Sequence, residues 1–325
     1  MKVFHHDDMD GRSSAAIVAA SKRLQFLREI ADSYGELSLA DTDRQLLREY
    51  ETKSIFIECD YASRRIDPSC VSEGEVVFIV DYSFSEKTVS VLEEICRKAS
   101  SVTWIDHHLT SKKLIETKDM SYLDNLKMVI DMSKSGAALC WDYLFGTTEP
   151  LFVQHVSDYD CWKYELGDNT TYMKLGIDMQ YNTPDSELYK KLIGDAFLEQ
   201  GYDLGYNIPI ENTYTIFSLI REGQVAKKYI DCENRSYFKH YSFVSDVFGM
   251  PCICVNRKTN SWVFGNAYHE YPLCCVFAYN GDVWSYSLYS SNGEVDCSEI
   301  AARYGGGGHK GAAGFSTKEC ILQKQ

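Results

Sequence analysis

Three polar residues follow the first short apolar segment of the chain at every second position. His6, Asp8 and Asp10 come after Val3 and Phe4, and alternation in an extended segment points side chains to the same side. One imidazole and two carboxylates that face one cavity suit Mn²⁺ or Mg²⁺, and the imidazole favours Mn²⁺ or another transition metal. The alternative is a capped helix start, in which Asp10 accepts hydrogen bonds from backbone N–H groups.

Two further polar clusters also follow apolar segments. Asp81 ends one such segment, and Asp106, His107 and His108 end another. A carboxylate beside two imidazoles is typical of a catalytic or metal-binding site. Asp81 alone could instead cap a helix. Asp158 follows an apolar helical segment, and taken alone it could equally be a surface residue.

A glycine-rich run near the C-terminus is the last cluster that could bind a ligand. Residues 305–315 read GGGGHKGAAGF, and glycines let backbone N–H groups approach a phosphate closely. His309 and Lys310 add hydrogen bonds and charge. The alternative is a flexible loop, which the small residues 311–314 argue against because they favour tight packing.

Alternating strands and helices must position the first three clusters. Strands are predicted at residues 3–4, 55–57, 76–80 and 102–105. Helices are predicted at residues 12–31, 85–99, 135–145 and 151–157. This alternation predicts an N-terminal α/β domain with a mostly parallel sheet flanked by helices. Such sheets bind ligands at the carboxyl ends of their strands, which is where the clusters lie, so we expect one shared site.

The apolar period changes to two after a long predicted helix at 212–232. β-Strands are expected at residues 242–248, 252–256, 261–265, 273–279 and 283–289, and a helix at 296–304. We therefore expect a catalytic domain over residues 1–195, a helical linker over 196–232 and a smaller α+β domain over 233–325.

The charge of the chain limits the partners that it can bind. Among 325 residues, 33 Lys and Arg stand against 47 Asp and Glu, which gives a net charge of −14. Residues 233–325 hold eight of each sign, so residues 1–232 carry the whole excess. This balance argues against binding a long duplex through its phosphates, but bound cations would still allow a small anionic substrate.

Cysteine usage indicates a reducing environment. The chain has twelve cysteines, no CxxC pair, no secretory signal and no apolar run of membrane-spanning length. We expect free thiols in the cytoplasm and no membrane partner.

The order of the motifs resembles the DHH phosphoesterases that carry a C-terminal DHH-associated domain. The sequence HDDMDG, a strand-end Asp, the sequence DHH, a downstream Asp and the sequence GGGGHKGAAGF occur in that order over nearly the whole chain. The resemblance implies hydrolysis of a phosphate ester with two divalent cations, with Mn²⁺ favoured and Mg²⁺ or Co²⁺ as alternatives.

The resemblance also implies a role for each motif residue. The first cation would be held by His6, Asp8 and Asp81, and the second by Asp10, Asp81, His107 and Asp158. Asp81 would bridge the two ions, His108 would face the substrate phosphate, and Asp106 would orient the histidines. The phosphate or nucleotide end of the substrate would be bound by Gly306, Gly307, Gly308, His309 and Lys310.

One position departs from the family pattern. Many DHH-associated domains carry an Arg in a strand motif like SLRS that grips the substrate phosphate, whereas residues 287–290 read SLYS here. Tyr289 would stack on a base or pack in the domain. Arg257 or Arg303 would take over the contact with phosphate.

The size and charge of the chain favour a short substrate. We expect a nanoRNase-like hydrolase that acts on short oligonucleotides. A homodimer is one assembly that the chain could form. The alternatives are a phosphodiesterase or phosphatase for a signalling nucleotide, such as a cyclic dinucleotide or phosphoadenosine phosphate, and a non-catalytic nucleotide-binding module. The complete set of expected metal ligands argues against the non-catalytic module.

Overall fold

The computed structural model describes residues 1–34, 54–61, 63–198, 204, 215–291, 293–308 and 310–322. The chain divides into two compact units, Met1–Gln224 and Val225–Gln325. The expected linker over residues 196–232 includes this division. The start of the helix predicted from residue 212 lies outside the described residues.

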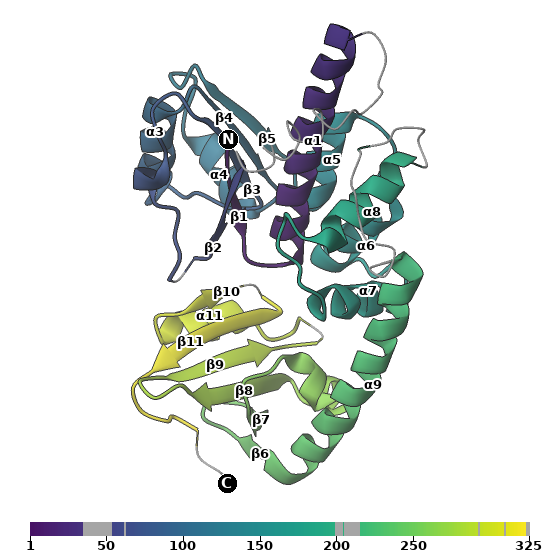
Figure 1. Ribbon diagram of the computed structural model, residues 1–325. Coiled ribbons are helices and arrows are strands. Elements are labelled where there is room, and N and C mark those ends of the chain that lie inside the picture. The colour runs from purple at the N-terminus through teal and green to yellow at the C-terminus, as the bar shows by residue number, and fades with distance from the viewer. Residues whose placement is uncertain are drawn as a thin grey trace. The chain divides into compact units, whose positions relative to one another are not determined.

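A five-stranded parallel sheet forms the centre of the first unit, in the order β2-β1-β3-β4-β5 (Figure 1). Its strands are β1 (Lys2–His6), β2 (Ile55–Cys59), β3 (Val76–Val80), β4 (Ser101–Asp106) and β5 (Leu126–Ile130). The predicted α/β class is confirmed. The edge strand β5 was not predicted from the sequence, and none of its residues is fully buried.

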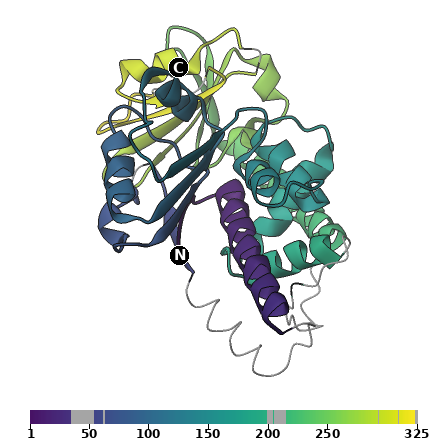
Figure 2. The ribbon, with the colours of Figure 1, turned by 90° about the horizontal axis from the view of Figure 1, so that it is seen from above.

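Helices cover both faces of this sheet, and in Figure 2 the strands lie between the purple helix α1 and the blue helix α3. The helices are α1 (Met9–Tyr34), η1 (Pro68–Cys70), α3 (Val89–Lys98), α4 (Leu109–Thr117), α5 (Gly136–Phe145), α6 (Leu151–Asp160), α7 (Asp168–Asp178) and α8 (Glu187–Leu198). Val3 and Phe4, which are neighbours in β1, belong to two different apolar cores. Alternate residues of a strand point to opposite faces, so a sheet covered on both sides needs apolar residues at successive positions.

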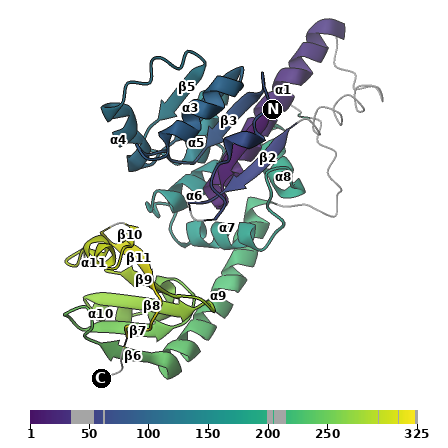
Figure 3. The same cartoon turned by 90° about the vertical axis from the view of Figure 1, so that its left-hand side faces the viewer.

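The second unit is built on a six-stranded mixed sheet, in the order β10-β11-β9-β8-β7-β6 (Figure 3). Its elements are α9 (Ile216–Tyr241), which begins in the first unit, and β6 (Ser242–Ser245), β7 (Cys252–Asn256), η3 (Ser261–Phe264), α10 (Ala267–Glu270), β8 (Leu273–Tyr279), β9 (Trp284–Tyr289), α11 (Cys297–Arg303), β10 (Gly307–Gly308) and β11 (Ala312–Thr317). Strands β7 and β8 are parallel, and the other neighbours are antiparallel. Within the described residues, no helix is long and apolar enough to cross a membrane.

The strand predicted at residues 261–265 is wrong. This segment forms the 3₁₀ helix η3, because the side chain of Asn260 accepts the backbone N–H of Trp262 and caps a helical turn. Val263 and Phe264 are still buried, so the apolar residues reach a core from a turn of helix and not from a strand.

Candidate functional site

Asp81 lies at the centre of a polar cluster at the carboxyl ends of β1, β3 and β4. Its Oδ1 atom is 3.2 Å from His107 Nε2 and 3.8 Å from His108 Nδ1. Its Oδ2 atom is 4.0 Å from His6 Nδ1. These strands are neighbours in the parallel sheet, so the fold brings the ends of three distant segments together. Asp81 therefore lies between His6 and His107, with one carboxylate oxygen toward each imidazole.

The backbone at Asp81 is in an uncommon conformation. Its φ angle is 52°, in the left-handed region that costs a non-glycine residue about 1–2 kcal/mol. Its backbone N–H donates to Ile105 O at 2.9 Å, which fixes the strained residue against β4. Such strain is concentrated at functional sites.

The turn between β1 and α1 supplies two of the expected ligands. His6 Nδ1 lies 2.7 Å from Asp8 Oδ2, and Asp8 Oδ1 accepts the backbone N–H of Gly11 at 2.9 Å. Burial raises the pKa of Asp8, but the hydrogen bond and charge of His6 outweigh it and lower the pKa to about 2. A Cβ atom on Gly11 would lie 2.4 Å from His6 O, so only glycine permits this turn. Ligand atoms of His6, Asp8 and Asp81 lie within 4.8 Å of one another.

Asp10 is buried against the first residues of α5. Its Oδ2 atom accepts the N–H of Gly136 at 2.6 Å, and its Oδ1 atom accepts the N–H of Ala137 at 2.9 Å. Asp10 therefore accepts hydrogen bonds from a helix start, as the alternative to a metal ligand predicted. The helix is α5, however, and not α1, to which Asp10 belongs. Its Oδ2 atom also lies 3.7 Å from His107 Nε2, so the same carboxylate borders the polar cluster.

Asp106 fixes the orientation of His108. Its Oδ1 atom is 2.7 Å from His108 Nδ1, and its Oδ2 atom accepts the hydroxyl of Ser83 at 3.0 Å and that of Ser111. A hydrogen bond at Nδ1 leaves Nε2 of the partly exposed imidazole for another partner. This arrangement agrees with the orienting role that the resemblance implies for Asp106.

The structure does not place Asp158 with the other expected metal ligands. Its carboxylate accepts the backbone N–H groups of Glu165 at 2.8 Å and Leu166 at 3.1 Å and the hydroxyl of Thr170. Asp160, two residues later, has its Oδ2 atom 3.1 Å from His107 Nε2. We therefore replace Asp158 by Asp160 in the proposed ligand set.

Helix periodicity explains this correction. Residues two apart in a helix point about 200° apart, so Asp158 and Asp160 cannot share a direction. Asp160 follows the buried residues Val153 and Val156 by seven and four positions, which places it on their face of α6. The spacing of Val153, Val156 and Asp160 is visible in the sequence, whereas the motif order alone does not separate Asp158 from Asp160.

Two buried atoms of the cluster make no hydrogen bond among the described residues, which fits a cation. Asp81 Oδ2 and His107 Nε2 are buried side-chain atoms that make no hydrogen bond, and such atoms normally have a partner. Burial and the neighbouring carboxylates of Asp10 and Asp8 raise the pKa of Asp81 well above its usual range. A divalent cation would satisfy both atoms and remove the repulsion. Oxygen and imidazole donors together suit Mn²⁺ and similar ions.

Replacement of Gly136 by alanine should damage the metal centre more than the fold. A Cβ atom there would lie 2.9 Å from Asp81 Cβ and 3.0 Å from Asp10 Oδ2, so both carboxylates must move. We expect a stability loss of about 1–3 kcal/mol and a clear loss of Mn²⁺ affinity by isothermal titration calorimetry. The control is Gly311→Ala, whose Cβ would meet only Ser290 O at 3.7 Å. Unchanged Mn²⁺ affinity in Gly136→Ala would contradict the assignment.

Two arginines near the carboxyl ends of β1 and β2 form ion pairs with Asp and Glu carboxylates. Arg12 donates to Glu58 at 2.8 and 2.6 Å. Arg64 forms ion pairs with Glu58, Asp7 and Asp60. Sequence analysis did not identify this network, because its members are far apart in sequence and have no common motif. It ties β2 to the turn that carries His6 and Asp8.

The glycine run predicted to bind substrate lies in the second unit. Gly307 and Gly308 form β10, which pairs with β11. A Cβ atom on Gly306 would lie 2.1 Å from Gly314 O, so tight packing on β11 accounts for this glycine. His309 lies outside the described residues.

The other residues predicted to bind substrate vary in exposure. Lys310 and Arg303 are exposed. Arg257 is half-buried, with its guanidinium carbon 4.6 Å from the centre of the Tyr237 ring. Tyr289 is half-buried against an apolar cluster of the same unit, which agrees with packing as one of its two expected roles. The binding roles of these residues stay predictions.

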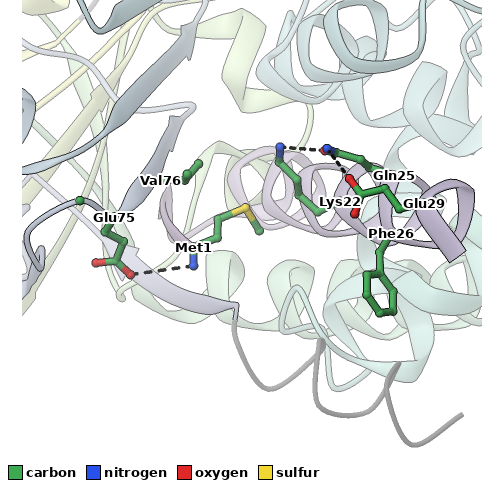
Figure 4. A pocket seen from close by; sticks show the side chains of 8 residues that line it. Met1, Lys22, Gln25, Phe26, Glu29, Glu75 and Val76 are labelled. Atoms are coloured by element: carbon green, nitrogen blue, oxygen red, sulfur yellow. Dashed lines mark hydrogen bonds and ion pairs between the residues drawn. The ribbon is translucent and has the colours of Figure 1, made fainter. Parts of the chain in front are cut away.

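A cavity of about 460 Å³ lies at the opposite ends of the strands, beside Met1 and Val76 (Figure 4). Its polar groups pair with one another: Lys22 Nζ donates to Gln25 at 3.3 Å, and Gln25 donates to Glu29 at 3.1 Å. Parallel sheets bind ligands at the carboxyl ends of their strands. This cavity is therefore not the candidate site.

No protein-family model matches this chain. The chain is 22% identical over 326 aligned residues to the uncharacterized protein R106 of Acanthamoeba polyphaga mimivirus, an alignment that covers 97% of this chain and 66% of that protein. It is 25% identical over 345 aligned residues to the oligoribonuclease NrnB of Bacillus subtilis, with 99% of this chain and 74% of that protein covered. A solved structure described as a DHH domain, PF0399, has a TM-score of 0.55 at 12% identity and covers 96% of this chain and 81% of its own.

The structural likeness shows that the chain has the fold of a DHH protein. The predicted resemblance to DHH proteins is thereby confirmed at the level of the fold. One of the two relatives is named an oligoribonuclease, which agrees with the predicted class of phosphate-ester hydrolases. The viral relative extends well beyond the aligned part, because the alignment covers 66% of that protein.

Proposed function

We propose that the chain is a metal-dependent phosphodiesterase that hydrolyses short oligonucleotides. The observation that carries this proposal is the convergence of three strand ends and the end of α6 around Asp81 Oδ2 and His107 Nε2. Both atoms are buried and make no hydrogen bond within the described part of the chain. The 25% identity to an oligoribonuclease over 99% of the chain supports the choice of substrate. The acidic excess of residues 1–232 supports a short substrate over a long strand.

The chain would hold two divalent cations, with Mn²⁺ favoured. The first would be bound by His6, Asp8 and Asp81, and the second by Asp10, Asp81, His107 and Asp160. When bound, such a pair lowers the pKa of a water molecule and neutralises charge on the phosphoryl oxygens.

The chain's own residues would position the reacting groups. Asp106 accepts the Nδ1–H of His108. In the imidazolium form, His108 would also carry a proton on Nε2, which would donate a hydrogen bond to a phosphoryl oxygen or pass to the leaving oxygen and leave a neutral imidazole. We propose that Gly306–Gly308, His309, Lys310, Arg257 and Tyr289 bind the nucleotide part of the substrate. We also propose a reducing, cytoplasmic setting, which the twelve free thiols support.

Product analysis by mass spectrometry would test this function. The panel contains RNA and DNA from dinucleotides to long strands, cyclic dinucleotides and phosphoadenosine phosphate, each with Mn²⁺ or with EDTA. We expect Mn²⁺-dependent release of mononucleotides, fastest from the shortest RNA and absent with EDTA.

Other outcomes would favour the alternatives. A preference for cyclic dinucleotides or phosphoadenosine phosphate would indicate a signalling-nucleotide enzyme. No turnover of any substrate, with Mn²⁺ bound, would indicate a non-catalytic nucleotide-binding module.

A further inference from the structure

A thiol lies beside the proposed second metal position. Cys161 directly follows Asp160 at the end of α6, and a sulfur, a carboxylate oxygen and a ring nitrogen from Cys161, Asp160 and His107 lie within 4.8 Å of one another. The backbone N–H of Cys161 donates to Ser157 O at 3.0 Å, which holds this residue at the helix end. Its side chain is half-buried, so the thiol borders the cluster and is not part of an apolar core.

His107 connects this thiol to the metal-binding carboxylates. Its Nε2 atom lies 3.1 Å from Asp160 Oδ2 and 3.2 Å from Asp81 Oδ1. The same atom is buried and makes no hydrogen bond. An ion bound at Nε2 would therefore have Cys161 within its surroundings.

The two metal positions differ in their donor atoms. The group of His6, Asp8 and Asp81 offers nitrogen and oxygen alone, whereas the group of His107, Asp160 and Cys161 adds sulfur. Thiolates select softer ions such as Zn²⁺ over Mg²⁺ and Mn²⁺, which prefer oxygen. A set of one nitrogen, one sulfur and carboxylate oxygens matches the four-coordinate sites that Zn²⁺ and Co²⁺ accept.

We propose that Cys161 supplies a thiolate ligand to the ion held by His107 and Asp160, so that this position selects thiophilic divalent ions. The inference rests on the proposed function in that both place an ion on His107. It goes further by giving the two positions different metal preferences.

Absorption spectroscopy of the Co²⁺-loaded full chain tests this ligand directly. Thiolate bound to Co²⁺ gives a strong sulfur-to-cobalt charge-transfer band in the near ultraviolet, which nitrogen and oxygen ligands do not give. We expect the band in the wild type and in the control Cys70→Ser, whose cysteine is exposed in η1. Cys161→Ser should bind Co²⁺ without the band, and its Zn²⁺ affinity should fall about tenfold or more while its Mn²⁺ affinity changes less.

Two results would overturn the inference: Co²⁺ binding by the wild type without the band, or a band that persists in Cys161→Ser. Should that variant not fold, alkylation of the native wild type followed by peptide mass spectrometry replaces it. Bound Zn²⁺ should protect Cys161 and leave Cys70 reactive, and equal reaction of both would count against the ligand. If the chain hydrolyses oligonucleotides with Mn²⁺ but shows no charge-transfer band with Co²⁺, the proposed function stands and the thiolate ligand is refuted. If the chain binds neither Mn²⁺ nor Co²⁺, both the proposed function and the thiolate ligand are refuted.

Discussion

Asp81→Asn should lower the rate of Mn²⁺-dependent hydrolysis by about 10³-fold or more, because one carboxylate serves both proposed cations. Asparagine adopts the left-handed backbone conformation of this position readily, and it has nearly the shape of aspartate. The fold should therefore survive. Steady-state kinetics on a dinucleotide and Mn²⁺ titration by calorimetry measure the two effects.

Asp124→Asn is the matched control for Asp81→Asn. Asp124 is exposed, so the same chemical change there should leave both turnover and Mn²⁺ stoichiometry as in the wild type. Full activity with normal Mn²⁺ binding in Asp81→Asn would refute the bridging role.

Asp160→Asn should reduce turnover by at least about 100-fold, whereas Asp158→Asn should mainly reduce stability. Asp160 lies against His107, and losing even a supporting partner of a metal ligand typically costs 10- to 100-fold in activity. Asp158 accepts hydrogen bonds from Glu165, Leu166 and Thr170, and an amide there would leave these donors, of which Thr170 is buried, poorly paired at a cost of about 1–3 kcal/mol.

Kinetics and thermal melting of both variants separate the two residues. The pair is well matched, since the same substitution is made two positions apart on one helix. Loss of Mn²⁺ binding in Asp158→Asn with normal turnover in Asp160→Asn would restore the ligand set first predicted from the motifs.

Much of the site could be predicted because its residues follow strands. The apolar runs before Asp81 and Asp106 are buried on both faces of the sheet, and parallel strands end at a common edge. Once these runs are identified as neighbouring strands, the meeting of His6, Asp81 and His107 follows from topology alone.

Other features of the site and the fold could not be predicted, because they depend on the direction of side chains and on hydrogen bonds between residues far apart in sequence. The choice between Asp158 and Asp160 needs the rotation of α6 about its axis. The capping of α5 by Asp10 joins residues 126 positions apart. The turn of η3 is capped by a hydrogen bond from the backbone N–H of Trp262 to the side chain of Asn260, which a period of two in the apolar residues does not reveal.

Anomalous diffraction at the manganese edge from crystals grown with Mn²⁺ would test the central claim most directly. We expect two peaks about 3.5–4 Å apart, with Asp81 contacting both and Asp160 contacting the one on His107. A single peak, or peaks remote from Asp81, would contradict the two-cation centre on which the proposed chemistry depends.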